Sequence, residues 1–172
     1  MKSKWMFTLL LAGVLGGGTG TYATDVTATT LTPPPGPVTK ILGQSAFDGF
    51  HVRANSIPPG LWRAVIKTHG QSDVYAVDNK FAPGATTGWH SHPGPSLIMV
   101  ISGTITDYMG DDPRCAGHDY SAGSGFIDAG GTDVHMLRNN GDMAAETIAV
   151  QILPHGAPRK SSEPQPSNCH VS

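Results

Sequence analysis

Short apolar or alternating runs, separated at close intervals by glycine, proline and aspartate, fill the middle of the chain. Polar and apolar residues alternate in Thr104–Tyr108, and Ser96–Ile101 is a largely apolar run of strand length, so both predict β-strands. About eight short strands with almost no helical periodicity predict a β-sandwich or small barrel. The other candidate strands lie at 61–68, 73–81, 88–92, 126–127, 134–138 and 145–153.

Two turns have sequences that favour tight hairpins. Ser102–Gly103 and Asn140–Gly141 each lie between two candidate strands. Glycine in such a two-residue connection permits the backbone conformation that a hairpin turn requires. We therefore expect each turn to join two strands that pair with each other.

Composition supports a turn-rich β protein and narrows its partners. The 172 residues include 22 Gly and 14 Pro, and only 14% are charged, which argues against helical bundles and coiled coils. A net charge of −2 gives no indication of a nucleic-acid binder or of a polybasic membrane anchor. We therefore expect no nucleic-acid partner.

The two ends of the chain lack the strand pattern. Two lysines precede an apolar run at 5–15, and the small residues Thr21 and Ala23 follow at the positions that a signal peptidase reads, which is the order of parts in a cleaved secretory signal. The run is too short to span a bilayer and no later stretch is long enough, so we expect a secreted or periplasmic protein without a membrane span; an uncleaved anchor is the alternative. The expected parts are a signal peptide at 1–23, a Thr/Pro-rich linker at 24–37, the domain at 38–154 and a C-terminal tail at 155–172.

The chain has two cysteines, Cys115 and Cys169. Export places them in an oxidising compartment, where a pair of cysteines usually forms a disulfide. Metal ligation is the alternative, but the two residues are far apart and form no CxxC motif. We therefore expect a Cys115–Cys169 disulfide that ties the C-terminal tail to a loop of the domain.

Three histidines have the spacing of a metal site. His90 and His92 are separated by one residue, so on a strand both side chains lie on one face, with Cα atoms about 7 Å apart. His135 begins a later candidate strand after a glycine turn. Three neutral imidazoles on one concave surface would bind a metal ion and leave positions open for water or substrate. An HxH pair alone is also compatible with an exposed, unligated pair.

The residues around these histidines resemble two motifs of the cupin superfamily. In the first motif, Gly84 is followed by ATTGW, His90-Ser91-His92, PGP, Ser96, LIMVIS and Gly103, and every spacing agrees. In the second, Gly130-Gly131 precedes His135, MLR and Asn139, although the motif's proline and middle glycine are absent. The resemblance covers about 73–153. It implies an all-β, cupin-type double-stranded β-helix (jelly-roll) barrel, with His90, His92 and His135 as metal ligands in its mouth.

The chain departs from the first motif at Ser96, which replaces the glutamate. With three histidines and no carboxylate, a bound divalent ion would keep its full charge, and imidazole ligands favour Fe, Cu or Zn over Mn. Ser96 either binds a metal-bound water or fills space. Asp128 and Asp133 flank the turn before His135, and we interpret them as ordinary turn aspartates rather than as part of the rim of the site.

The resemblance suggests an activity as well as a fold. Cupin-like proteins with three histidines and no glutamate include thiol dioxygenases and a diketone-cleaving dioxygenase. Our first hypothesis is therefore a metal-dependent oxygenase that acts on a small chelating substrate or, with copper, oxidatively on extracellular polysaccharide. The alternative is a non-catalytic module that binds a metal or a small ligand, because a fold does not determine a function.

Strand periodicity also predicts an apolar outer surface. If the metal-site histidines point inward, then so do Ser96, Ile98 and Val100, which leaves the side chains at 97, 99 and 101 on the outer face. These three are leucine, methionine and isoleucine, so we expect the face to be covered, either by a second copy of the chain in a homodimer or by the chain's own segment 41–68. The remaining five histidines are expected at the surface.

Overall fold

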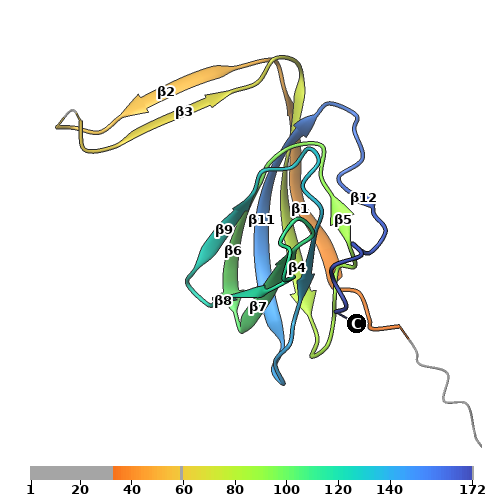
Figure 1. Cartoon of the computed structure of the whole chain (residues 1–172). Helices are drawn as coiled ribbons and strands as arrows, with labels where there is room; N and C mark the ends of the chain where they lie inside the picture. The colour runs from red at the N-terminus through yellow and green to blue at the C-terminus, as the bar shows by residue number, and fades with distance from the viewer. Residues whose placement is uncertain (1–32, 59, 172) are drawn as a thin grey trace, which may run out of the picture. The chain divides into compact units, whose positions relative to one another are not determined.

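The computed structural model describes residues 33–58 and 60–171, which form two five-stranded antiparallel sheets and one separate hairpin (Figure 1). The first sheet contains β1 (Val38–Phe47), β4 (Ser72–Phe81), β11 (Ala145–Pro154), β6 (Ser96–Ser102) and β9 (Gly125–Asp128), in that spatial order. The second contains β12 (Ser161–Ser162), β5 (His90–Ser91), β10 (His135–Arg138), β7 (Thr104–Met109) and β8 (Gly117–Ser121). The hairpin pairs β2 (His51–Asn55) with β3 (Arg63–Lys67).

Between β4 and β11 the chain crosses from one sheet to the other at every connection except β7–β8. This alternation is the wiring of a jelly roll, and it confirms the predicted all-β fold. The expected signal peptide at 1–23 and most of the expected linker lie outside the described residues. Within the described part of the chain, no helix has the length and hydropathy needed to cross a membrane.

The two predicted hairpins are wrong. β6 pairs with β9 and β11, whereas β7 pairs with β8 and β10, so the chain changes sheets at Gly103. It changes sheets again after Asn140–Gly141, between β10 and β11. Gly103 has a φ of 70°, and a Cβ there would lie 2.7 Å from the Ala144 carbonyl oxygen. Glycine is therefore required here because the chain passes from one sheet to the other at a closely packed corner. This corner needs the same positive φ that a hairpin turn needs.

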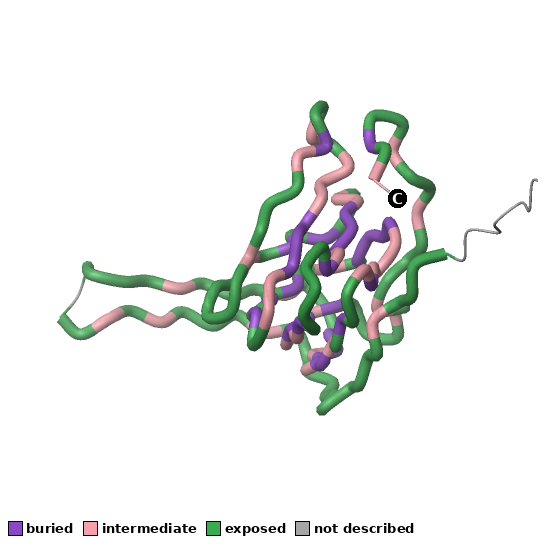
Figure 2. The backbone as a smooth tube through the Cα atoms, turned by 90° about the horizontal axis from the view of Figure 1, so that it is seen from below, coloured by how far each residue is buried: buried purple, intermediate pink, exposed green. Residues whose placement is uncertain are grey.

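The core lies between the two sheets and contains side chains from both. The buried residues gather along the strands in the middle of the molecule, as the colouring of the backbone in Figure 2 shows. Phe81 and Ala145 from the first sheet pack with Ile105 and Leu137 from the second. On β6 the predicted alternation is confirmed, because Ser96, Ile98 and Val100 are buried and the residues between them are exposed. The inward face of β6 therefore contributes to the interior in which the histidines lie.

The outer face of β6 is not covered by segment 41–68 of the chain. Leu97, Met99 and Ile101 are 44%, 45% and 51% exposed. β1 is separated from β6 by β4 and β11, and β2 and β3 pair with each other, so segment 41–68 does not lie over this face. Coverage by that segment, one of the two alternatives from the sequence, is therefore wrong.

The C-terminal tail is part of the second sheet. β12 pairs with β5, with Ser161 opposite Ser91 and Ser162 opposite His90. The predicted Cys115–Cys169 disulfide is present, with 5.2 Å between the Cα atoms. Its sulfurs pack in a buried cluster with Trp89 and Met136. Strand pairing and the disulfide thus both fix the tail to the domain, with β12 next to the strand that carries His90.

Candidate metal centre

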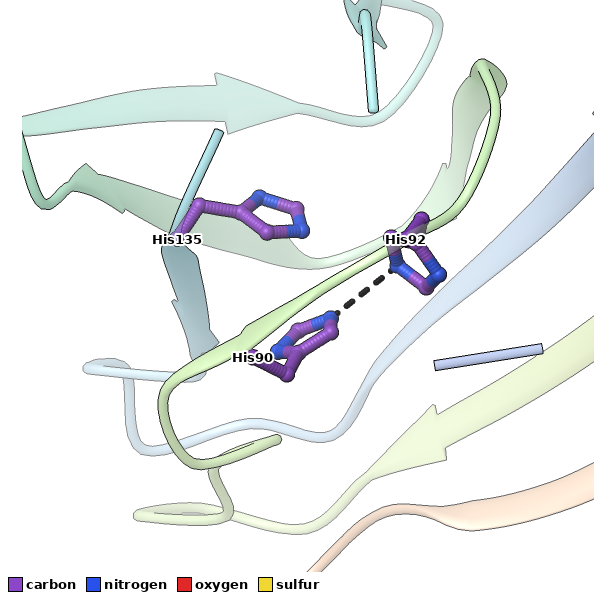
Figure 3. A group of neighbouring side chains, drawn as sticks. All are labelled: His90, His92 and His135. Carbon is purple, nitrogen blue, oxygen red and sulfur yellow. Dashed lines mark hydrogen bonds between the residues drawn. The ribbon is translucent and has the colours of Figure 1, made fainter. Parts of the chain in front are cut away.

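The fold brings the three predicted histidines together from two strands. β5 begins with His90, His92 follows directly after it, and His135 begins β10. His135 is the register partner of His90 across the second sheet, so neighbouring strands present both rings to the interior. All three side chains are buried and face one another (Figure 3). The five remaining histidines are exposed, as predicted: His51, His69, His118, His155 and His170.

Each ring is fixed from behind through its Nδ1 atom. Each Nδ1 atom lies within hydrogen-bond distance of a protein oxygen. His90 Nδ1 lies 2.9 Å from the Gly88 carbonyl oxygen, and His92 Nδ1 lies 2.5 Å from the Arg159 carbonyl oxygen. His135 Nδ1 lies 3.1 Å from a carboxylate oxygen of Asp107. Carbonyl and carboxylate oxygens only accept hydrogen bonds, so each Nδ1 carries the proton and donates it. The proton-free lone pair is then on Nε2, which is the arrangement found behind metal-bound histidines.

The Nε2 atoms converge on a common point. His90 Nε2 lies 3.1 Å from His92 Nε2, the contact marked in Figure 3, and one ligand nitrogen from each of the three rings lies within 4.8 Å of the others. With both Nδ1 atoms protonated, the two Nε2 lone pairs face each other and cannot form a hydrogen bond. Two nitrogens bound at right angles to one ion at about 2.1 Å would be about 3.0 Å apart. The three-histidine group is therefore positioned for metal binding.

Burial keeps His90 and His92 in the neutral form that binds metals. Burial, with a smaller contribution from the neighbouring His135, lowers the pKa of His90 to about 3, while the Gly88 carbonyl opposes the shift. Burial also lowers the pKa of His92, against the opposing effects of the Arg159 carbonyl and Asp128. Neutral imidazole is the species that donates a lone pair, so protons do not compete for these nitrogens near neutral pH.

A carboxylate adjoins the site, contrary to the expectation from the sequence. The Asp128 Oδ2 atom lies 3.7 Å from His92 Nε2 and 3.8 Å from His135 Nε2. Its Oδ1 atom accepts the Gly130 N–H at 2.8 Å. The interpretation of Asp128 as a turn aspartate is therefore right for one oxygen and wrong for the other, which faces the histidines. Within the described residues, Asp133 forms no ion pair with them.

Ser96, which replaces the motif glutamate, contributes to a buried hydrogen-bond network. Its Oγ atom accepts a hydrogen bond from Gln151 Nε2 at 3.2 Å. The Gln151 Oε1 atom in turn accepts one from Arg159 Nη1 at 3.3 Å, and Gln151 Nε2 lies 3.3 Å from His92 Nδ1. Ser96 thus supports the residues behind His92.

Sequence reasoning missed the groups that orient the rings. The acceptor for His92 is a backbone carbonyl in the tail, which no residue type reveals. For Asp107 there was one weak indication in the sequence. An acidic residue within a predicted strand either faces solvent or, if it is buried, needs a partner for its charge. In the structure Asp107 is buried behind His135.

A cavity of about 70 Å³ opens onto the histidines. Apolar side chains from both sheets, including Ile98 and Leu137, form part of its wall. Arg159 and Lys160 line it from the tail, and Lys160 Nζ donates to the Thr87 carbonyl at 3.3 Å. The cavity is therefore small, partly apolar and bordered by two cationic side chains.

Comparisons with known proteins find one family model and several similar solved structures. Residues 79–151 match the family model of the Cupin domain. Similar solved structures include an oxalate oxidase, with 24% identity over 45% of this chain and 41% of that chain and a TM-score of 0.41. Another is an uncharacterized conserved protein with a double-stranded beta-helix domain from Klebsiella pneumoniae, with 18% identity over 74% and 86% of the two chains and a TM-score of 0.47. A third is a predicted oxalate decarboxylase from Thermotoga maritima, with 21% identity over 49% and 83% and a TM-score of 0.39.

The alignment with oxalate oxidase spans only 41% of that chain, and no curated protein matches the sequence. Family membership therefore depends on the matched domain, the jelly-roll wiring and the motif histidines that meet inside it. On this evidence residues 79–151 of this chain form a domain of the cupin superfamily.

Proposed function

We propose that this cupin binds one divalent transition metal through His90, His92 and His135 and acts as a metal-dependent oxygenase on a small chelating anion. One observation carries the metal site: three buried rings, each fixed at Nδ1 by a protein oxygen, direct their Nε2 atoms at one another. Such a set is prepared for an ion before the ion arrives, which is how proteins achieve tight binding.

The cavity supports a small anionic substrate. Its volume of about 70 Å³ is enough for several water molecules, since about 10–15 Å³ of such space holds one. A polysaccharide chain does not fit this space, whereas a carboxylate of a few non-hydrogen atoms does. Arg159 and Lys160 at the wall would offset the negative charge of such a ligand.

The protein's own groups supply orientation and an enclosed environment. Bound iron or copper would supply Lewis acidity and the redox chemistry with dioxygen that an oxygenase needs. The histidines hold the ion, the Nδ1 contacts fix the rings, and the apolar wall around Ile98 and Leu137 limits access of water. We expect the two tail cations to orient the substrate.

Metal analysis tests the first part of the proposal. Purified wild-type protein should bind one equivalent of metal by elemental analysis and isothermal titration calorimetry. His90→Ala, His92→Ala and His135→Ala should each lose most of the bound metal, because each removes one of three histidine ligands. His118→Ala, at an exposed histidine, is the matched control and should retain full occupancy. Unchanged occupancy in one of the three variants would remove that residue from the site.

Oxygen uptake tests the second part. Protein loaded with iron, copper or zinc is mixed with oxalate, small thiols, diketones and oligosaccharides in an oxygen electrode. We expect uptake with iron or copper and a small chelating compound, and none with the oligosaccharides. Metal binding without uptake for any small chelator would overturn the oxygenase proposal and leave the non-catalytic binding module.

We also propose that the protein is exported and forms a homodimer. The Cys115–Cys169 disulfide supports export, since structural disulfides persist in oxidising compartments. The dimer is supported by the apolar outer face of β6, where Leu97 pairs with Ile127 of β9, which is 70% exposed. A contiguous apolar surface of this kind is typical of a contact with another protein. Cell fractionation tests the location, and light scattering after gel filtration tests the dimer.

A further inference from the structure

The residue that replaces the motif glutamate lies directly opposite an aspartate. Ser96 of β6 and Asp128 of β9 are register partners in the first sheet. Side chains of directly paired residues lie on the same face, with Cβ atoms about 4.5–5.5 Å apart. Both residues are buried, at 1% and 5% exposure. A carboxylate missing from one strand is thus present on its neighbour, on the same inward face.

One oxygen of this carboxylate is held and the other is unpartnered. Asp128 Oδ1 accepts the Gly130 N–H, whereas Oδ2 is buried and has no hydrogen-bond partner within the described residues. An isolated buried carboxylate oxygen is strongly unfavourable. The two nearest ring atoms, Nε2 of His92 and His135, are 3.7 and 3.8 Å away, beyond hydrogen-bond length, and carry lone pairs rather than protons. His135 Nε2 is likewise buried without a partner in the described part of the chain.

The turn after β9 is shaped to hold this aspartate in place. Gly130 has a φ of 72°, and a Cβ there would lie 2.4 Å from the Gly94 carbonyl oxygen. Only glycine permits this close approach and backbone conformation together. Its N–H fixes Asp128 Oδ1, so that Oδ2 is left directed at the histidines.

We propose that Asp128 Oδ2 is the fourth protein ligand of the metal, supplied from β9 in place of the carboxylate that Ser96 lacks. This inference rests on the proposed three-histidine metal site. Ligand atoms bound to one ion at about 2.1 Å are separated by about 3.0 Å at right angles and about 4.2 Å when opposed. The observed separations of 3.7 and 3.8 Å lie within that range. A divalent ion would satisfy the unpartnered Oδ2 and both facing lone pairs at once.

The fourth ligand changes the metal preference deduced from the sequence. An anionic oxygen lowers the net charge of a divalent site by one, and it provides the hard ligand that Mn²⁺ prefers. The reason for disfavouring manganese was the absence of a carboxylate at position 96. With Asp128 as a ligand, manganese joins iron, copper and zinc as a candidate ion.

The test compares four proteins by calorimetric titration with Mn²⁺ and with Zn²⁺. These are wild type, Asp128→Asn, the double variant Ser96→Glu with Asp128→Asn, and the control Asp133→Asn in the neighbouring turn. Asp128→Asn should bind Mn²⁺ more than about 100-fold more weakly, because loss of a residue behind a ligand already costs 10–100-fold. Its loss for Zn²⁺ should be smaller, since imidazole suits zinc. The double variant should recover at least part of the Mn²⁺ affinity, and the control should bind like wild type.

Thermal unfolding separates a ligand from a structural residue. Asparagine keeps the Oδ1 acceptor for Gly130 and removes a buried charge, so metal-free Asp128→Asn should melt at the same temperature as metal-free wild type or higher, while the rise in Tm on adding Mn²⁺ is lost. A lower Tm of the metal-free variant with a retained metal-induced rise would show a structural role and overturn the inference. If wild type binds metal and Asp128→Asn binds it equally tightly, the inference about Asp128 is overturned but the proposed three-histidine site is not. Wild type that binds neither ion would overturn the proposed function as well.

Discussion

Removal of the Cys115–Cys169 disulfide should destabilise the protein and weaken the metal site at the same time. The perturbation is the double variant Cys115→Ala with Cys169→Ala, which leaves no reactive thiol. Alanine avoids burying new hydroxyl groups, since both cysteines are buried. The effect on stability follows from the size of the covalent loop, which spans 54 residues.

In the chain-entropy model, closing a loop of this length stabilises the folded state by about 4 kcal/mol at 25 °C. At about 2.1 cal/mol/K of unfolding entropy per residue, a folded unit of about 140 residues would lose about 14 °C in Tm. Loss of sulfur contacts with Trp89 and Met136 acts in the same direction. Total stability for a domain is about 5–15 kcal/mol, so the variant should remain folded at low temperature.

Urea unfolding of metal-free protein, followed by tryptophan fluorescence, measures the difference. Dithiothreitol should lower the free energy of unfolding of wild type to about that of the variant, and it should not change that of the variant. This comparison separates the effect of the disulfide from other effects of the substitutions. A loss below about 1 kcal/mol would refute the loop-entropy reasoning. Metal affinity should fall about 10–100-fold, because the freed tail no longer holds the Arg159 carbonyl against His92. Unchanged affinity would show that β12 pairing alone keeps the tail in place.

Three further predictions address other parts of the molecule. Asp107→Asn should weaken metal binding by about 10–100-fold by titration calorimetry, since the charged acceptor behind His135 is lost; equal affinity would dismiss this role. The backbone N–H of Gly156, with a hydrogen bond from the His155 side chain, holds the pKa of Asp73 below 3.8, so this carboxylate stabilises the fold above that pH and the contribution disappears as pH falls below it. Asp73→Asn should therefore flatten the dependence of Tm on pH in acid, and curves of identical slope would contradict this. Leu97→Ser should convert a dimer to a monomer in light scattering after gel filtration, whereas a monomeric wild type would exclude the dimer.

The sequence predicted eight of the twelve strands of the described residues and the histidine set, because both depend on local spacing; it missed β1, β2, β8 and β12. Alternation on β6 identified which side chains point inward, and the HxH spacing placed two rings on one face. Both inferences need only the geometry of a single strand. The third ring, His135, was found through a resemblance between motifs, and strand pairing brings it opposite His90.

What the sequence did not reveal depends on pairing between distant strands. The turn at Gly103 has hairpin chemistry, but the partner of each strand is decided by the whole sheet. Asp128 became a candidate ligand only when the register placed it opposite Ser96. The carbonyl of Arg159 is invisible to residue-based reasoning, since every residue has one. Local patterns therefore predict elements and faces, whereas the surroundings of a site require the tertiary fold.

The position of β12 near the C-terminus determines when the candidate metal site can become complete during synthesis and folding of the chain. A chain synthesised only as far as Pro154 already contains all three histidines and Asp128, yet it lacks the strand that pairs with His90 and the carbonyl that orients His92. We therefore expect the proposed metal site to bind its ion only after β12 has been synthesised and the two cysteines have formed their disulfide. If a protease removed the tail, we expect the site to release its ion. The two sheets would lose only the edge strand β12, and their other nine strands would stay folded.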